Sequence, residues 1–459
     1  MLSTIDIVII VGYLVAMLIL GFVLGRKETA DGFFVNSRKT RTFLLIFTAL
    51  STSVGAGTVI GVAGAAYNTG ISFGLSFALI SILAWLFIAW LAPVIKRWGD
   101  KLQAYTFGDF LRARFSKRTQ VVGSVVTVIA YFFNASIQFV AFATLAKIIS
   151  GVSFEVALLT AGVVTILYTI FAGIKGDFYT DALQFFVMIP VFVFLFYSGF
   201  SQIPVGEIFS QLPTMHLNIF NYSGPGFFVG SLIFGFPLLL VSMEIWQRIF
   251  AAKDAKTARR AFLWSGILKI TVIVAAVLLG FLAFHLVDGG TQETALFDLM
   301  LKILPSGALG IGFASILAIL MSTIDSMLMV GSATLTKDFY LQKHPNATEK
   351  QTLKMGRLFV FLFGACALVL ALFYRDIVGL AITAVQILAV FAPAFIGGLL
   401  WQRASERGAF WSILTGFVLT IALLPFMPTT AFLPAILLSI IIFVVFSLKN
   451  KERFELTSK

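Results

Sequence analysis

Long apolar segments dominate this chain and restrict it to folds that cross a lipid bilayer. A membrane-spanning helix needs about 20 consecutive apolar residues. Thirteen segments of this kind follow one another, near residues 5–25, 42–66, 70–95, 120–149, 154–173, 178–200, 226–249, 260–286, 307–336, 355–373, 377–401, 409–427 and 430–448. Hydrophobic residues make up 59% of the 459 residues and charged residues only 12%. We therefore expect an all-α polytopic membrane protein with about 13 transmembrane helices.

The distribution of lysine and arginine predicts how these helices are oriented. If the N-terminus lies outside, 29 of the 33 Lys and Arg fall in cytoplasmic segments, and Lys147, Lys302 and Arg375 fall outside. Cytoplasmic loops of membrane proteins carry such an excess of positive charge. We expect a multi-pass protein of the cell membrane with its N-terminus outside and its C-terminus in the cytoplasm. The net charge of +12 is then explained without a nucleic-acid partner.

A glycine-rich stretch interrupts the second apolar segment near its middle. Gly55, Gly57, Gly61 and Gly64 lie within residues 51–64, where a membrane helix should be most regular. A glycine inside a helix costs about 1 kcal/mol relative to alanine. In hydrocarbon, each freed backbone carbonyl must also find a partner inside the protein. Broken membrane helices use such carbonyls to bind cations, so this segment predicts a helix broken around a cation.

A second interruption follows in the seventh segment, at Gly235-Phe236-Pro237. Proline removes a helical hydrogen bond and clashes with the preceding turn. Two broken segments at corresponding positions of two halves predict an inverted-repeat transporter. We expect five parts: a peripheral first span with its loop at 1–41, a first five-helix repeat at 42–200, an extracellular loop at 201–225, a second, inverted repeat at 226–402, and peripheral spans 12 and 13 with a cytoplasmic tail at 403–459.

The ninth segment places a carboxylate among hydroxyl groups. Ser315, Ser322, Asp325 and Ser326 share one helix face, since they are spaced by three, four and seven residues, and Thr323 borders that face. Asp325 precedes Lys337 at the cytoplasmic end by 12 residues, or about 18 Å of helix. A carboxylate so deep in a membrane is costly and by default functional, and clustered oxygens suit a hard cation. The alternative is that Asp325 serves as a hydrogen-bond hub between helices.

Three further charged side chains lie in or next to the apolar segments. Lys269 and Asp181 each allow two interpretations, and Glu244 allows a structural one. Lys269, about nine residues into the eighth segment, either pairs with Asp325 or another acid or contacts substrate. Glu244 precedes Arg248 by one turn, which predicts an i,i+4 ion pair. Asp181, near the start of the sixth segment, either caps that helix or lines a cation path.

Four motifs, taken in order and spacing, carry a resemblance to a known family. They are STSVGAGTVIGVAG at 51–64, YTDALQ at 179–184, WQRIFAAKDAKTARRA at 246–261 and MSTIDSML with TKDFY at 321–340. The chain resembles the sodium:solute symporter family over nearly its whole length. This resemblance implies a LeuT-type core of five plus five helices and sodium-driven uptake of an organic solute.

The resemblance also implies the residues that bind sodium. The family's sodium site carries over to the backbone carbonyls of Ser51, Val54 and Ile319 and to the hydroxyls of Ser322 and Thr323.

A second cation site, found in some members, carries over to Asp181, Asp325 and Ser326. Asp325 stands where those members have a hydroxyl, so this position could instead bind a proton. Lys269 matches a lysine in the eighth span of many members.

For the substrate pocket, the resemblance points to residues near the two breaks and on three further spans. They are Gly55, Ala56, Gly57, Thr58, Asn134, Gln138, Phe236, Lys269 and Gln386. Sugar transporters of the family carry Glu-Gln in place of Gly57-Thr58, and proline transporters carry Asp in place of Ser53. This chain has neither, so we expect an amino acid or small carboxylate rather than a sugar.

Taken together, these patterns predict a secondary symporter that couples inward sodium movement to uptake of a small organic solute by alternating access. Two alternatives stay open: a proton-coupled transporter on the same core and, more remotely, a channel or a transporter-like receptor. We expect sodium as the coupling ion, no organic cofactor, no enzymatic activity and no obligatory protein partner. The expected partners are the solute and the lipid bilayer.

Overall fold

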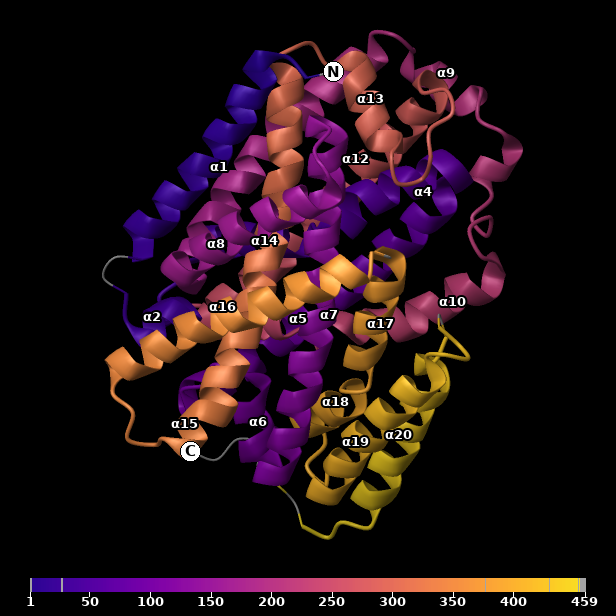
Figure 1. The fold of residues 1–459 in the computed structure, drawn as a ribbon. Helices are drawn as coiled ribbons and strands as arrows, with labels where there is room; N and C mark the ends of the chain where they lie inside the picture. The colour runs from indigo at the N-terminus through magenta and orange to yellow at the C-terminus, as the bar shows by residue number, and fades with distance from the viewer. Residues whose placement is uncertain (1, 26–27, 376, 429, 453, 455–459) are drawn as a thin grey trace.

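Helices form almost all of the computed structural model, which describes residues 2–25, 28–375, 377–428, 430–452 and 454 (Figure 1). In these residues the β structure is limited to one isolated parallel bridge between Thr40 and Ala252. The Thr40 amide donates to the Ala251 carbonyl at 3.0 Å, and the Lys253 amide donates to the Thr40 carbonyl at 2.9 Å. The rest of the predicted cytoplasmic tail, at 453 and 455–459, lies outside the described residues.

The α-helices are α1 (Thr4–Gly25), α2 (Ala30–Val35), α3 (Thr42–Ser53), α4 (Val62–Thr69), α5 (Ile71–Leu102), α6 (Phe107–Arg114), α7 (Lys117–Ser150), α8 (Phe154–Phe200), α9 (Val205–Ser210), α10 (Gly224–Gly235), α11 (Met243–Ala251), α12 (Ala255–Leu286), α13 (Ala295–Ile303), α14 (Ala308–Thr334), α15 (Leu341–Lys343), α16 (Glu349–Phe373), α17 (Ile377–Ala389), α18 (Ala392–Leu400), α19 (Glu406–Leu423) and α20 (Phe432–Leu448). The 3-10 helices are η1 (Asn36–Arg38), η3 (Thr214–Leu217) and η4 (Phe236–Leu239), and the π-helices are η2 (Gly57–Gly61) and η5 (Leu335–Tyr340).

The predicted all-α membrane fold is confirmed. In the described part of the chain, nine helices are long and apolar enough to cross a membrane, or up to eleven if each of two bent pairs is one span. The apolar helix α20, with 17 residues, is shorter. The count of thirteen spans and the division into two repeats stay predictions.

Helix α8 changes direction at one glycine. A straight helix of its 47 residues would be about 70 Å long, more than twice the roughly 30 Å of a hydrocarbon core. Gly173 has φ 55° and ψ −169°, and a Cβ there would lie 2.4 Å from the Phe33 ring. Its two parts coincide with the predicted fifth and sixth segments. The expected connector at 174–177 is helical, because the single positive-φ glycine makes the whole turn.

The first predicted break is confirmed. Helix α3 ends at Ser53 and η2 begins at Gly57, with an angle of 62° between the two helical parts. Val54 leaves the helical region, with φ −101° and ψ 65°. Gly55 approaches α14 so closely that a Cβ would lie 3.1 Å from the Thr323 hydroxyl oxygen. The glycines thus permit both the bend and the close contact.

The second break is present but lies later than predicted. Helix α10 ends at Gly235 and continues as η4, and the 41° bend falls at 240–242, before α11. Pro237 lies in the first turn of η4, where its missing N–H would have no helical partner in any case. The proline therefore starts a tighter helix, and the chain bends only after it.

Helix α14 runs through the middle of the bundle, against α8, α7, α1, α16 and α3 (Figure 1). Every residue from 312 to 334 is buried. Small residues such as Gly312, Ser322 and Gly331 allow neighbouring helices to approach closely. At one edge of the molecule α19 and α20 pair with each other, while α1 keeps one apolar face exposed. The core of the molecule is therefore organised around α14.

Replacing Gly173 should destabilise the turn inside α8. Gly173→Ala adds a Cβ at positive φ and forces it against the Phe33 ring, so we expect a lower melting temperature in detergent. Gly12→Ala in α1 is the matched control, because a Cβ there meets nothing within 4 Å. Equal melting temperatures for the two variants would contradict this account of the turn.

Candidate functional site

The end of α3 and the middle of α14 bring the predicted sodium ligands together. The Ser322 hydroxyl lies 3.5 Å from the Ser51 carbonyl oxygen, across the two helices. Ser322 also donates to the Ile319 carbonyl at 3.0 Å, and Thr323 donates to the same carbonyl at 3.2 Å. Each hydroxyl oxygen keeps lone pairs while its hydrogen is donated. Hydroxyls and carbonyls thus converge at the break in α3.

A small hollow lies between these groups. Ser51, Val54 and Ile319 line it from α3, the break and α14. Helix α8 closes it with Gln184, Phe185 and Met188. The three residues whose carbonyls were predicted to bind sodium therefore border one small space, and α8 supplies its remaining wall.

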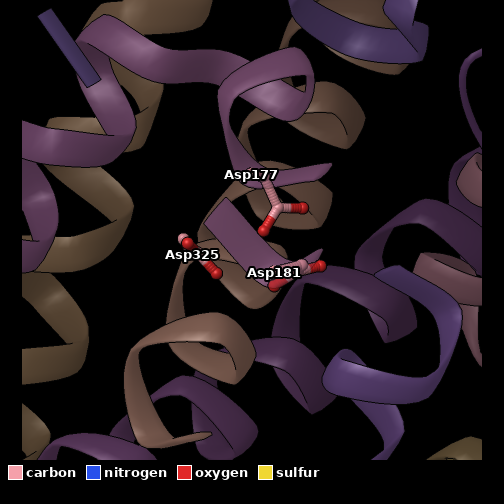
Figure 2. Close-up of side chains that lie close together, drawn as sticks. All are labelled: Asp177, Asp181 and Asp325. Atoms are coloured by element: carbon pink, nitrogen blue, oxygen red, sulfur yellow. The ribbon is translucent and has the colours of Figure 1, made fainter. Parts of the chain in front are cut away.

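Next to the hollow, three buried aspartates form a cluster (Figure 2). Asp177 and Asp181 lie on α8, and Asp325 lies on α14. One carboxylate oxygen from each lies within 4.8 Å of the others, and each residue is at most 1% exposed. Asp325 and Asp181 thus come together as predicted, and Asp177 joins them.

The Arg248 guanidinium of α11 pairs with this cluster. Its Nη2 lies 3.1 Å from an Asp177 oxygen and 2.9 Å from an Asp181 oxygen. It also donates to the Ser326 hydroxyl at 2.9 Å, and its Nε donates to the Thr48 hydroxyl at 3.1 Å. Arg248 is fully buried, so four helices, α3, α8, α11 and α14, meet at one guanidinium.

The charges of the cluster do not balance. Three carboxylates face one guanidinium, and burying an unpaired charge is costly. Asp325 Oδ2 and Asp181 Oδ1 are buried and have no hydrogen-bond partner in the described part of the chain. The cluster therefore has room, by charge and by free lone pairs, for a proton or a second small cation.

Threonine side chains connect the cluster with the sodium site. Thr52, which follows Ser51 directly, donates to an Asp181 oxygen at 3.3 Å and lies 3.2 Å from the Ser326 hydroxyl. Thr48, one turn earlier, donates to the same Asp181 oxygen at 2.6 Å. The two candidate cation sites are therefore adjacent and share helices α3 and α14.

Two interpretations of these acids are wrong. Asp181 does not cap a helix, because the turn at Gly173 places it well inside the second part of α8. Glu244 does not form the predicted ion pair: Arg248 meets the backbone carbonyl of Glu244, at 3.3 Å. The Glu244 carboxylate accepts a short hydrogen bond from the Tyr131 hydroxyl of α7. Arg248 instead pairs with the carboxylates of Asp177 and Asp181, which lie further away in sequence.

Lys269 on α12 forms no ion pair with Asp325 or with any other acid that the structure describes. Its side chain is buried, and its Nζ lies 5.3 Å from the centre of the Phe77 ring on α5. Helix α12 also packs against η2, directly after the first break. Of the two interpretations of Lys269, the ion pair is therefore not found among the described residues, and contact with substrate stays a prediction.

The other predicted substrate residues are not gathered into one cavity. Gly57 is exposed at the break and a Cβ there would meet nothing within 4 Å, whereas Gly55, Ala56 and Thr58 pack more closely around it. Asn134 and Gln138 lie on α7, and the Gln138 amide oxygen is buried without a partner in the described structure.

Two more substrate candidates have contacts of their own. Phe236 packs edge-on against Phe87. Gln386 donates to the Pro428 carbonyl at 2.8 Å and accepts from the Phe432 amide at 2.9 Å. Both ends of its amide therefore hold the connection before α20.

A separate cavity of about 620 Å³ lies between α2, α6, the start of α7, and η5 with α15. Tyr105, Asp109, Arg112, Lys117 and Lys337 are among its lining residues. None of the predicted site residues lines it. This cavity is distinct from the cation sites.

Sequence reasoning missed Asp177 and Arg248 as partners of Asp181 and Asp325. The spacing of four residues between Asp177 and Asp181 was a usable signal, since it places both carboxylates on one helix face. Arg248 gave no such signal, because its partners lie 67 or more residues away along the chain.

The chain is similar in sequence to known transporters. The sequence model of the sodium:solute symporter family matches residues 33–416. The chain is 28% identical to the sodium/pantothenate symporter of Escherichia coli (strain K12), over 95% of each chain. It is 24% identical to sodium/glucose cotransporter 1 of Oryctolagus cuniculus, over 91% of this chain and 71% of that protein.

Solved structures have the same fold. A Na⁺-coupled sialic acid symporter in a substrate-bound, outward-open state matches with a TM-score of 0.85 and 18% identity, over 98% of this chain and 99% of the other. A transporter of the nucleobase-cation-symport-1 family matches with a TM-score of 0.61 and 15% identity, over 94% and 98%.

Removing Arg248 should strongly destabilise the protein, because the buried carboxylates of Asp177 and Asp181 would lose their counter-ion. For Arg248→Met we expect the free energy of unfolding to fall by about 3–5 kcal/mol, seen as a large drop in melting temperature in detergent. Asp177→Asn combined with Asp181→Asn in the same variant should recover part of this loss. Arg375→Met is the control, because its ion pair with Glu155 is exposed to solvent and such pairs contribute little to stability. Similar losses for both arginines would contradict the central role of Arg248.

Proposed function

This chain belongs to the sodium:solute symporter family, whose members are transporters and not enzymes, and from this membership we propose that it couples inward movement of Na⁺ to uptake of a small organic solute. The observation that carries the proposal is the convergence at the break of α3. There the Ser322 hydroxyl comes to 3.5 Å from the Ser51 carbonyl, and Val54 and Ile319 line the same hollow. We propose that these groups, with the Thr323 hydroxyl, bind the coupling sodium ion.

Membrane orientation and repeat structure form part of the proposal. We propose an N-terminus outside and a C-terminus in the cytoplasm, supported by the distribution of Lys and Arg. The division into inverted repeats at 42–200 and 226–402 is supported by the two bent helix pairs, one early in each repeat.

Coupling follows from the position of the sodium site. An ion held between α3 and α14 would fix the angle of the break, and Gly57, on the other side of that break, is exposed. Solute bound beside Gly57 would then prefer the same arrangement of the break as sodium does. By linkage, each ligand raises the affinity of the other by the same factor.

Removing the two hydroxyls should weaken sodium binding. In proteoliposomes, Ser322→Ala combined with Thr323→Ala should raise the Na⁺ concentration for half-maximal uptake at least several-fold, because two of five proposed ligands are lost. Thr334→Ala is the control: it lies on the same helix, and among the described residues its hydroxyl donates only to the Val330 carbonyl of its own helix. Unchanged sodium dependence in the double variant would refute the proposed site.

We further propose that Asp181, Asp325 and Ser326, with Asp177, hold a second small cation or a proton. The charge imbalance and the two unpartnered carboxylate oxygens support this site. The same proteoliposomes, driven by a sodium gradient or by a pH gradient alone, separate the two ions. Uptake driven by the pH gradient, and lost in Asp325→Asn, would favour the proton-coupled alternative, whereas uptake that requires sodium favours sodium coupling.

For the solute we propose a small carboxylate. Lys269 is buried in the membrane part of α12 without an acidic partner in the described residues, so an anionic ligand would supply its missing counter-charge. Two relatives are sodium/pantothenate symporters, from Escherichia coli and from Haemophilus influenzae, the latter 26% identical over 93% of this chain. Pantothenate is therefore the first carboxylate to test.

Ligand-dependent melting temperatures should identify this solute class. We expect pantothenate or another small carboxylate to raise the melting temperature only when Na⁺ is present, and glucose to have no effect. Lys269→Met should abolish this rise while leaving the stabilisation by Na⁺ alone intact, because the lysine contacts the solute and not the ion. Stabilisation by glucose, or an unchanged response to carboxylates in Lys269→Met, would contradict the assignment.

A further inference from the structure

The cavity of about 620 Å³ between α2, α6, α7 and η5 is lined by segments that the proposed orientation places in the cytoplasm. Its volume falls within the roughly 300–1,000 Å³ of pockets that bind small molecules. Three cationic side chains line it, each from a different element: Arg112 from α6, Lys117 from the first turn of α7 and Lys337 from η5. Positive charge from three parts of the chain thus meets around one space.

The three acidic side chains of the same lining already have partners. Asp109 accepts hydrogen bonds from two backbone amides just before α6, at 2.8 and 3.3 Å. Asp31 lies 3.9 Å from the Arg38 guanidinium, and Glu349 accepts from the first backbone amide of α2 at 3.3 Å. These acids therefore do not neutralise the cations of the cavity.

Two of the cations, by contrast, are free to bind a ligand. The side chains of Arg112 and Lys117 form no ion pair and no hydrogen bond within the described ranges of the chain, and both residues are exposed at the cavity. Lys117 is also the first residue of α7, where the helix dipole adds partial positive charge. The free charge of the cavity is therefore positive.

The third cation is held in place by its neighbour in the chain. The buried Asp338 carboxylate accepts hydrogen bonds from the Thr106 hydroxyl at 2.8 Å and from the Ser124 hydroxyl at 2.7 Å. These bonds fasten η5 to α7 and to the residue before α6. The Lys337 ammonium then lies 4.7 Å from the centre of the Tyr105 ring. The TKDFY motif thus forms a fixed wall of the cavity.

We propose that this cavity binds a phosphate group, carried either by a soluble phosphate compound of the cytoplasm or by a phospholipid headgroup. A guanidinium matches two phosphate oxygens at once, and ammonium groups add charge-assisted hydrogen bonds. A phosphate can carry close to two negative charges, so it suits several cations better than a single carboxylate does.

A phosphate in this position would connect parts of the molecule that meet around the cavity. Helix α2 precedes the broken helix α3 in the chain, and η5 continues α14. The site goes beyond the proposed function, because it lies apart from the proposed sodium and solute sites and binding there requires neither ligand.

Two exposed cations test the site without disturbing the core. Arg112→Gln combined with Lys117→Gln should weaken the binding of inorganic pyrophosphate to the purified protein about ten-fold or more, measured by calorimetry. Without pyrophosphate, its melting temperature should equal that of the wild type. Arg118→Gln combined with Lys354→Gln is the matched control: it removes the same charge from exposed residues that do not line the cavity, so its affinity should be unchanged. Potassium chloride keeps the ionic strength constant, because salt screens exposed charges.

Nanodiscs distinguish the two sources of phosphate. If a lipid headgroup occupies the cavity, phosphatidic acid added to phosphatidylcholine nanodiscs should raise the melting temperature of the wild type and of the control but not of the variant at Arg112 and Lys117. Pyrophosphate binding with the same dependence on these two residues supports a soluble phosphate. Equal responses of the two double variants, or no response of the wild type to either probe, would overturn the proposal. These measurements use neither sodium nor solute, so their outcome is separate from that of the transport experiments.

Discussion

The close approach of α14 to the break after Ser53 is the contact on which the rest of the structure depends. A helix broken inside hydrocarbon exposes backbone oxygens that no water can reach. Here α14 covers the break with hydroxyls instead of apolar side chains: Ser322 faces the Ser51 carbonyl, and Gly55 leaves just enough room for Thr323. The same feature that makes the break tolerable therefore creates a set of oxygens suited to a cation.

The cluster around Arg248 shows how charge is accommodated in this interior. One guanidinium satisfies carboxylates from α8 and hydroxyls from α3 and α14. Each of these contacts joins helices that are distant in sequence. A buried arginine of this kind is expensive to desolvate and is retained only with excellent hydrogen bonding. The cluster holds more carboxylates than guanidinium groups, which is the basis for the second cation or proton site that we propose there.

Much of this arrangement could be predicted from the sequence, because its signals are local. Glycines within an apolar segment gave the first break, and hydroxyls at fixed helical spacing gave Ser322 and Thr323. What could not be predicted depends on distant pairing. Arg248 forms ion pairs with the two aspartates of α8 and not with Glu244 in its own helix, since tertiary packing brings both aspartate carboxylates to the guanidinium.

Other differences between the sequence predictions and the structure have local causes. The kink at Gly173 takes the place of the four-residue gap between the predicted segments at 154–173 and 178–200, because one glycine with positive φ is enough to redirect the helix. The second bend moved beyond Pro237, because proline is a good start for a 3-10 helix. Gln184 ends the YTDALQ motif, but the sequence does not show that its amide oxygen is buried without a partner in the described structure.

The small bridge between Thr40 and Ala252 has a mechanical consequence. It joins Thr40, two residues before α3, to Ala252, the residue just after α11, so the two broken helices are connected at one end by paired backbone hydrogen bonds. Backbone bonds of this kind have no side-chain rotamers through which to yield. The segments that enter α3 and leave α11, the helix that carries Arg248, are thus held together by backbone hydrogen bonds.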